Sequence, residues 1–461
     1  MAETKDVSII VSTLLTLLEE KKYPTVKEIL ITMNPADIAA AFEEMDESRL
    51  PVLFRLIPKE LAADTFVEME SDLQELLIRG FSDNELKEVL DELYVDDAVD
   101  IVEEMPANVV KRILAQADPE LRKDINEILR YPENSAGSIM TIEYVTLRPD
   151  MTVKEAILRI RRTGFDKETI YTCYVTSYRK LIGILTVKDL LLAQDEETLI
   201  KDIMDQNVIF ANTHDDREEV VQKLSKYNFI ALPVVDSDLR LVGIVTFDDA
   251  MDVMEDEATE DMEIMAGITP SDKTYLKSNV FEIFRHRIPW LLLLMVSATF
   301  TGLIITKFEN ALAAQVVLTA FIPMLMDTGG NSGSQSSVTV IRALSLGELE
   351  FRDILIVIWK EIRTAVLCGF ALSTACFGKI MLVDRFLMRN DDITLTVALT
   401  VCLTMVLTVM VAKVIGCTLP MIAKKLGFDP AVMASPFITT MVDAISLLVY
   451  FGMANILLFG V

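Results

Sequence analysis

The sequence predicts a multidomain protein that combines an all-α helical superhelix, an α+β tandem pair, a connecting helix and an α-helical membrane domain with five transmembrane helices. Charge is the first observation, because residues 1–284 carry 59 acidic and 30 basic side chains while residues 285–461 carry 11 and 13. Hydropathy is the second, since the long apolar runs begin only after residue 287. The third is periodicity, which is helical over 1–135 and alternates between strand and helix over 136–254.

Residues 1–135 are predicted to form the acidic helical superhelix. A helical unit that ends in Glu-Met recurs at 35–45, 58–69 and 95–105, and prolines stand between the amphipathic stretches. Similar helices that each carry one apolar face bury that face by stacking on their neighbours. The negative balance disfavours nucleic acid or an anionic membrane surface as a partner of this part. It favours cations.

Residues 136–254 contain one pattern twice, which divides them into 136–199 and 200–254. The run IGILTVKDLL at 182–191 aligns with VGIVTFDDAM at 242–251. This tandem order of strand, glycine, strand, Thr-x-x-Asp and helix resembles a pair of CBS domains.

The resemblance to CBS domains implies a cleft that binds an adenine nucleotide such as ATP. The turn residues that would bind its ribose are Thr186 with Asp189, or Thr246 with Asp249. A second interpretation stays open, in which each Thr caps the following helix and each Asp suits the helix dipole.

The membrane part follows a connecting helix predicted over residues 252–284. The five apolar runs are 288–306, 313–341, 364–383, 394–416 and 432–461. Each has the length of about 20 residues that a bilayer core requires. The first residues lack the basic region of a signal peptide, and Lys and Arg are more frequent in the loops on the N-terminal side of the membrane. We therefore expect a multi-pass protein of the plasma membrane with its N-terminus in the cytosol and its C-terminus outside.

A polar segment, IPMLMDTGGNSGSQ at residues 322–335, interrupts the second apolar run. Polar backbone and side chains at membrane depth are tolerated only against protein or a water-filled cavity, so the segment predicts a path for a polar solute. Close helix packing is the alternative role of its glycines. The candidate pore-lining residues are Asp327, Gly329, Gly330, Asn331, Gly333, Gln335, Thr439 and Thr440.

Asp443 is expected to be the only carboxylate deep within a span. An ionised group at that depth is expensive and is therefore expected to face the bundle interior and to serve function. Hard divalent cations prefer oxygen ligands, and Mg²⁺ gives up its waters reluctantly, so a wide site would bind the hydrated ion. One carboxylate neutralises half of a dication, which favours a homodimer with the path on its twofold axis. A protonated Asp443 that hydrogen-bonds a neighbouring helix is the alternative.

The motif Pro-x5-Gly-Gly-Asn-x-Gly-x-Gln in the second of five spans, together with the tandem CBS pair and the acidic helical N-terminal part, resembles the MgtE family of magnesium channels. The resemblance covers essentially the whole chain. It implies a homodimer in membrane lipid that conducts Mg²⁺ at the subunit interface, where Asp443 coordinates the hydrated ion. It also implies that the connecting helix acts as a plug, and that cytosolic Mg²⁺ bound among carboxylates closes the path.

Carried onto this chain, the resemblance implies three groups of regulatory carboxylates. Without metal, facing carboxylates repel, and a cation that binds the closed form more tightly shifts the population towards it. The implied plug acids are Asp252, Glu257, Glu260 and Asp261. Asp96 and Asp100 are expected to face Asp249 and Glu218, and Asp429 is expected to meet the plug.

Other readings belong to different classes. One alternative is a CBS-regulated transporter of another ion, either a different divalent cation or an anion. An anion transporter would need intramembrane basic residues. Lys379 and Lys413 are the candidates, and we expect both to lie near span ends and to extend to the interface. A nucleotide-sensing scaffold without transport leaves Asp443 unexplained. An enzyme is not expected, because the chain has two histidines and no Cys–His pair or nucleophile elbow.

Overall fold

The computed structural model describes residues 3–271, 275, 278–390 and 392–459. The chain forms two compact units that divide between Met254 and Glu255, and each is described by itself. The first unit begins with ten helices. They are α1 (Glu3–Glu19), α2 (Tyr23–Ile31), α3 (Pro35–Glu43), α4 (Leu50–Phe54), α5 (Lys59–Val67), α6 (Ser71–Gly80), α7 (Asp83–Leu90), α8 (Val95–Glu104), α9 (Ala107–Gln116) and α10 (Pro119–Ile128).

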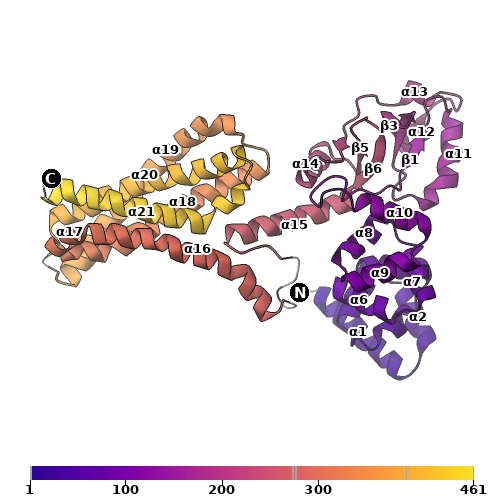
Figure 1. The fold of residues 1–461 in the computed structure, drawn as a ribbon, viewed down its shortest axis with the longest axis horizontal. Helices are drawn as coiled ribbons and strands as arrows, with labels where there is room; N and C mark the ends of the chain where they lie inside the picture. The colour runs from indigo at the N-terminus through magenta and orange to yellow at the C-terminus, as the bar shows by residue number, and fades with distance from the viewer. Residues whose placement is uncertain (1–2, 272–274, 276–277, 391, 460–461) are drawn as a thin grey trace. The chain divides into compact units, whose positions relative to one another are not determined.

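These helices form the predicted superhelix (Figure 1), and by their contacts alternate helices pack on one another. Helix α1 packs on α3, α3 on α5, α5 on α7 and α7 on α9, while α8 packs on α10. One apolar core runs from Val11 to Ile128. Prolines occupy the first turns of α2, α3, α4 and α10, where the missing N–H would have no helical partner. Short helices with one buried face thus build one continuous core.

The CBS pair contains two three-stranded sheets of the same topology. The first joins β1 (Val145–Leu147) in parallel to β2 (Thr172–Ser177), which pairs antiparallel with β3 (Lys180–Thr186). The second joins β4 (Ala211–Asn212), β5 (Ala231–Val235) and β6 (Leu241–Thr246) in the same way. The flanking helices are α11 (Val153–Thr163), α12 (Val187–Leu192), α13 (Ile200–Ile203) and α14 (Arg217–Tyr227).

The two CBS copies interlock through the glycine of each repeat. A Cβ atom on Gly243 would lie 2.5 Å from the Sδ atom of Met140, and one on Gly183 would lie 2.6 Å from that of Met204. The backbone repeats this exchange, because Thr141 N donates to Ile244 O at 2.8 Å and Ile184 N donates to Asp205 O at 2.9 Å. The methionine before one sheet therefore packs on the glycine of the other copy.

The connecting helix α15 occupies Phe247–Met265 and crosses the division between the units. Prediction placed a helix over 252–284, but among the described residues after Met265 no helix occurs before α16 begins at Val280. Gly267 follows the helix with a φ of +71°, a conformation that favours glycine and ends the helix.

The second unit is a helical bundle (Figure 1). Its elements are α16 (Val280–Lys307), α17 (Glu309–Ala314), a 3₁₀ turn (Val316–Phe321), α18 (Ile322–Ser345), α19 (Ile354–Lys379) continued by a π-helical stretch (Ile380–Leu387), α20 (Leu395–Lys425), a 3₁₀ turn (Pro430–Met433), and α21 (Ser435–Ala454) with a π-helical end (Asn455–Phe459). Helix α18 packs against α20 and α21, α19 packs against α20, and α16 packs against α21.

Four helical segments of the described chain are long and apolar enough to cross a membrane. They are Val280–Lys307, Phe351–Leu387, Leu395–Lys425 and Pro430–Leu458. Helix α18, which carries the polar segment, has 24 residues, a length of roughly 36 Å at 1.5 Å per residue. The predicted second span begins at Ile322 in the structure and not at 313, because a short helix and a 3₁₀ turn precede it. The count of five spans stays a prediction.

Candidate functional site

The glycines of the polar segment form the packing face of α18. A Cβ atom on Gly329 would lie 2.7 Å from Cγ2 of Thr408, and one on Gly333 would lie 2.8 Å from Cγ2 of Ile438. Gly330 faces Thr439, whose Cγ2 lies 3.0 Å from the same position. Helix α18 continues without a break through all three glycines. They serve close helix packing, which was the alternative stated for them, and they do not interrupt the helix.

The opposite face of α18 carries a polar stripe of Asp327, Asn331 and Gln335. These residues follow one another at four-residue spacing, and all three are exposed in the single chain. Asn331 Nδ2 donates to Asp327 Oδ1 at 3.1 Å. The polar segment therefore has two faces, one of small residues against α20 and α21 and one of amide and carboxylate groups that the chain's own bundle leaves uncovered.

Asp443 lies on α21, half-buried and within electrostatic range of Asp327 on α18. Two neighbours on α21, Thr439 and Thr440, donate their hydroxyl hydrogens to the carbonyl of Pro436 at 3.0 and 2.9 Å. Their oxygen atoms keep lone pairs that can accept hydrogen bonds. Asp327 and Asp443, from different helices, thus lie within electrostatic range of one another. That Asp443 is the only carboxylate deep within a span stays a prediction.

A buried ion pair in the bundle was missed by the sequence analysis. Lys413 of α20 lies 3.6 Å from the Oε2 atom of Glu361 of α19, and their side chains are 6 % and 16 % exposed. Lys413 was expected to extend to the interface, but it points into the bundle and donates to Ser336 Oγ of α18 at 3.3 Å. Lys413 stands within the apolar run 394–416 and Glu361 stands three residues before the run 364–383, but nothing in the sequence indicated that the two pair.

The end of α15 packs on the membrane bundle within the second unit. Ile264 and Met265 contact a small apolar cluster of Ile341, Ala431 and Ala434. The hydroxyl of Ser345 donates to Asp261 Oδ2 at 3.3 Å. Burial raises the pKa of Asp261, and the negative charge of the nearby Asp429 raises it further.

Asp261 of α15 and Asp429 thus lie within electrostatic range of one another, and their charges repel. That the plug meets Asp429 at a regulatory site stays a prediction. Glu257 adds to the same negative potential, and Arg342 opposes it. Glu260 lies half-buried on α15, one residue before Asp261. Asp252 lies exposed in the part of α15 that belongs to the first unit, close enough to Asp249 to raise its pKa.

An acidic cluster lies between the N-terminal helices and the CBS pair. Burial raises the pKa of Asp97 and of Asp100 to about 7, and the charge of Asp249 contributes to both shifts. Asp96 is 8 % exposed, and burial followed by the charge of Asp249 raises its pKa well above the ordinary value. The pKa of Asp249 itself is raised by burial to about 6.

Glu168 of the first CBS copy extends this cluster and was not predicted. Burial raises its pKa to about 8, with contributions from the charges of Asp248, Asp249 and Asp97. Its Oε2 atom is buried without a hydrogen-bond partner. Glu218, by contrast, lies in the first turn of α14, where Gln222 Nε2 donates to it at 3.3 Å. Among the described residues, no three His, Cys, Asp or Glu side chains converge as ligands of one metal ion.

The two Thr-x-x-Asp turns differ in accessibility. Thr186 and Asp189 form a capping box, in which Thr186 N donates to Asp189 Oδ2 at 2.8 Å and Asp189 N donates to Thr186 Oγ1 at 3.2 Å, and both residues are exposed. The hydroxyl of Thr246 is buried and donates to Asp249, which already belongs to the acidic cluster. Thr186 thus caps the helix that follows it, as in the second interpretation, and its turn is the more exposed of the two. Which turn binds a nucleotide stays a prediction.

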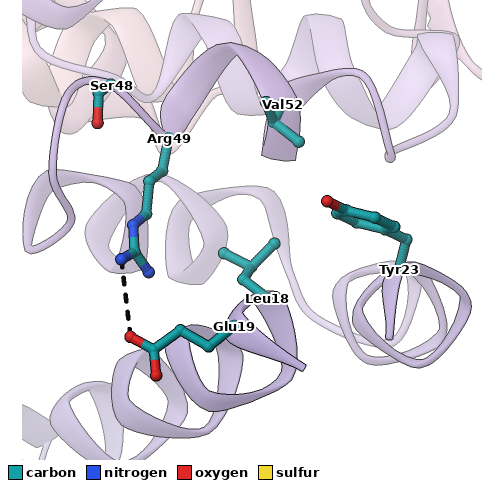
Figure 2. Close-up of a pocket in the computed structure, with 6 residues that line it drawn as sticks. All are labelled: Leu18, Glu19, Tyr23, Ser48, Arg49 and Val52. Carbon is teal, nitrogen blue, oxygen red and sulfur yellow. Dashed lines mark ion pairs between the residues drawn. The ribbon is translucent and has the colours of Figure 1, made fainter. Parts of the chain in front are cut away.

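A shallow open pocket lies elsewhere, on the N-terminal helices (Figure 2). Its volume is about 220 Å³. Arg49 lies on one side with its Nη2 atom 3.7 Å from Glu19 Oε1, and Tyr23 lies on the other. The lining residues are Leu18, Glu19, Tyr23, Ser48, Arg49 and Val52, and none of the predicted site residues is among them.

Comparison with known proteins places these features in one family. The model of the MgtE intracellular N domain matches residues 33–134, that of the CBS domain matches 136–196 and 200–256, and that of MgtE, a divalent cation transporter, matches 322–453. A Thermus thermophilus protein named magnesium transporter MgtE is 35 % identical over 446 residues, which cover 96 % of this chain and 97 % of that protein. A Bacillus subtilis protein of the same name is 32 % identical over 440 residues, 95 % of each chain.

Two solved structures match the first half of the chain. The cytosolic domain of the Mg²⁺ channel MgtE in complex with ATP is 35 % identical, has a TM-score of 0.50, and covers 53 % of this chain and 99 % of its own. The soluble part of a magnesium transporter is 30 % identical with a TM-score of 0.51, and covers 55 % and 99 %. These relatives confirm the predicted order of helical domain, CBS pair and membrane helices. The chain belongs to the MgtE family of divalent cation transporters.

Proposed function

We propose that this chain carries Mg²⁺ into the cell across the plasma membrane, and that two copies enclose one path for the ion. The polar stripe of Asp327, Asn331 and Gln335 is the observation that carries the proposal. In a single copy this stripe is exposed on a membrane helix. Carboxylate and amide groups that meet lipid are expensive, whereas a second copy across a twofold axis would cover the stripe or enclose water against it.

Asp443 is the residue that we assign to the ion. It lies near Asp327, so the two copies of a dimer would bring four carboxylates to one region. Such a site supplies oxygen ligands and negative charge while remaining wide enough for a hydrated Mg²⁺. The names of the full-length relatives, both magnesium transporters, support the choice of this ion.

The anion alternative loses its support from the basic residues of the bundle. Lys413 is paired with Glu361, and Lys379 Nζ lies 2.7 Å from Asp384 Oδ2. Each of the two lysines that the anion reading required is thus neutralised by an acid. A net positive site for an anion does not form from these residues.

Transport by the purified protein in liposomes tests the assignment. We expect Asp443→Asn to reduce the initial rate of Mg²⁺ uptake at least about tenfold, because the substitution removes a charge that attracts the ion. Asp384→Asn is the matched control, since it neutralises an acid near the end of α19 that is paired with Lys379. Uptake by the Asp443→Asn protein at the wild-type rate would refute the site.

The dimer is tested separately by crosslinking. A variant whose five cysteines are replaced, and which carries Asn331→Cys on the polar stripe, is expected to crosslink between two copies in membranes. A cysteine in place of the exposed Leu367 of α19 is the control, because that residue lies outside the stripe. Equal crosslinking at both positions would argue against an interface at α18.

Cytosolic Mg²⁺ is proposed to close the path by binding the acidic clusters of the first unit and of α15. The acids Asp96, Asp97, Asp100 and Asp249 repel when ionised, and a dication between them would replace repulsion by attraction. Since the described carboxylates do not converge as ligands of one ion, we propose that Mg²⁺ binds them partly through its waters. With the N-terminus in the cytosol, these clusters sense the internal concentration and the C-terminus lies outside.

ATP is proposed to bind the CBS pair at the turn of Thr186 and Asp189. The related cytosolic domain that was solved in complex with ATP supports this choice. We expect Thr186→Val to lower ATP affinity, because the exposed hydroxyl is lost, whereas Thr246→Val removes a buried hydroxyl and leaves ATP affinity near that of the wild type. Calorimetric titration of the full-length protein distinguishes the two. An equal loss in both variants, or none in Thr186→Val, would contradict the assignment.

A further inference from the structure

Three polar side chains from three membrane helices meet inside the bundle. Glu361 of α19 accepts a hydrogen bond from the hydroxyl of Ser336 of α18, and its Oε2 atom lies 3.6 Å from Lys413 Nζ of α20. Lys413 Nζ also donates to Ser336 Oγ at 3.3 Å. Lys413 and Ser336 are 5 % and 2 % exposed. We call this set the charge clamp.

Burial of these charges has to be explained, because nothing in the proposed path requires a lysine. Removing an acid and a base from water is expensive and is repaid only when the two are paired and further hydrogen bonds satisfy them. Replacing such a pair by apolar side chains is often neutral or stabilising, so stability alone is a weak reason for it. Ionisable residues within membrane helices are more often tied to function.

The charge clamp lies next to the closest approach of α18 and α20. A Cβ atom on Gly416 of α20 would collide with the carbonyl group of Gly333 of α18. The carbonyl oxygen of Ala412, the residue before Lys413, lies 3.2 Å from the Cβ position at Gly333. Glycine at both helices therefore sets the distance between them, and the charge clamp bonds the same two helices one turn away.

Ser336 of the charge clamp and the polar stripe lie on different sides of α18. Ser336 lies about 100° around α18 from Gln335 and about 140° from Asn331, since each residue of an α-helix advances the position by about 100°. Ser336 is buried, whereas Asn331 and Gln335 are exposed. A rotation of α18 about its axis that breaks the bond to Glu361 would therefore turn the polar stripe by the same angle.

We propose that Ser336, Glu361 and Lys413 are positioning residues that hold the rotation of α18, and that the neutrality of the pair keeps the path attractive to a dication. The inference rests on the proposed Mg²⁺ transport. An unpaired Lys413 would place a positive charge in the low-dielectric bundle that holds Asp443, and this charge would oppose entry of Mg²⁺. An unpaired Glu361 would place a negative charge there, and this charge would favour entry of Mg²⁺.

Charge-neutral substitutions separate this role from a purely structural one. The measurement is Mg²⁺ uptake by purified full-length protein in liposomes over a range of external Mg²⁺, which gives KM and the maximal rate. We expect Glu361→Gln to raise KM roughly tenfold or more, as loss of supporting partners around a metal site commonly does. Lys413→Gln is expected to leave KM unchanged or lower, with a reduced maximal rate. The double variant E361Q/K413Q is expected to return KM to within about twofold of the wild type.

Ser336→Ala isolates the positioning part of the proposal. It keeps both charges and removes the hydroxyl that joins them to α18, so we expect a lower maximal rate at an unchanged KM. Asp384→Asn, which breaks the Lys379–Asp384 pair near the end of α19, is the matched control and is expected to change neither quantity.

The results that would overturn the proposal are specific. If both single variants raised KM alike and the double variant did not recover it, the pair would be structural only. If a single variant failed to reach the membrane, the double variant and Ser336→Ala would decide, because the proposal requires near-normal KM in both. Absence of Mg²⁺ uptake by the wild-type protein would refute the proposed function itself, an outcome that is distinct from any pattern among the variants.

Discussion

Asp96 of α8 and Asp249 of α15 lie within electrostatic range of one another, and both are largely buried. Burial raises the pKa of Asp96 well above its ordinary value, and the negative charge of Asp249 raises it further. The hydroxyl of Thr246 donates to Asp249 and lowers its pKa in part, yet burial prevails and the value is about 6. Two carboxylates thus lie in a contact that favours either a proton or a cation between them.

The first prediction concerns pH. Raised pKa values mean that the folded contact binds more protons than the unfolded chain, so stability falls as pH rises between the unfolded and folded values. For Asp97 and Asp100 that window runs from about 4 to about 7. Without divalent cations, we expect the protection of the α8 amides against hydrogen exchange, corrected for the intrinsic rise of exchange with pH, to fall as pH increases from 5 to about 8. Added Mg²⁺ is expected to flatten this dependence.

The control for the pH experiment is the double variant D97N/D100N, which lacks two of the titrating groups. The corrected protection of its α8 amides is expected to depend less on pH than that of the wild type, and to respond less to Mg²⁺. Greater corrected protection of α8 at pH 8 than at pH 5 in the wild type would show the sign to be wrong.

The second prediction concerns the close approach of α18 and α20. Gly416→Ala adds a methyl group where the carbonyl of Gly333 lies, so the helices must separate. Overpacking of this kind typically costs about 1–3 kcal/mol. We expect a lower midpoint of thermal unfolding in detergent and a lower rate of transport. Gly452→Ala in α21 is the matched control, because no atom lies within 4 Å of its Cβ position, and a midpoint equal to that of Gly416→Ala would contradict the packing argument.

The third prediction concerns the end of α15. Asp261 accepts from Ser345 and is repelled by Asp429, so neutralising it removes a repulsion that Mg²⁺ would otherwise have to offset. We expect Asp261→Asn alone to change the internal Mg²⁺ concentration at which transport is half-inhibited. We expect the fourfold variant, which adds Asp252→Asn, Glu257→Gln and Glu260→Gln, to be inhibited less by internal Mg²⁺. Uptake into liposomes loaded with graded Mg²⁺ measures this effect. Unchanged inhibition in the fourfold variant would remove the plug from the gating proposal.

A fourth prediction distinguishes Glu168 from its acidic neighbours. The carboxylate has a buried oxygen without a hydrogen-bond partner, and burial raises its pKa to about 8. Glu168→Gln retains the shape and removes the charge, so we expect slower hydrogen exchange of α8 in metal-free solution at pH 8. Glu155→Gln, in the exposed capping box of α11, is the control. Faster exchange in Glu168→Gln would indicate that the charge stabilises the contact.

Much of the fold was predictable because local signals agreed with one another. Prolines such as Pro35 and Pro119 occupy first turns of helices, and the two Thr-x-x-Asp turns mark equivalent positions of the CBS copies. The end of the connecting helix was harder to predict, because the acidic run over 252–263 has helical periodicity but does not indicate where the helix stops. Gly267 was the signal that ends it.

The site was predictable in composition more than in arrangement. Asp443 and the polar segment stood out because polar groups are rare in apolar runs. The pairing of Glu361 with Lys413 was not predictable, since it depends on the relative rotation of α19 and α20 and not on spacing within one helix. The same holds for Asp327, whose exposure is known only once the glycine face of α18 is seen to pack on α20 and α21.

The reciprocal seating of Met140 on Gly243 and of Met204 on Gly183 has a consequence for each copy taken alone. One CBS copy made alone would expose both its methionine side chain and the open space beside its glycine. A second copy of the same repeat would fill that space and cover that side chain. A single repeat would therefore leave its apolar methionine exposed unless a second copy covered it. The tandem repeat supplies that second copy within one chain, so the contact forms without association of two molecules.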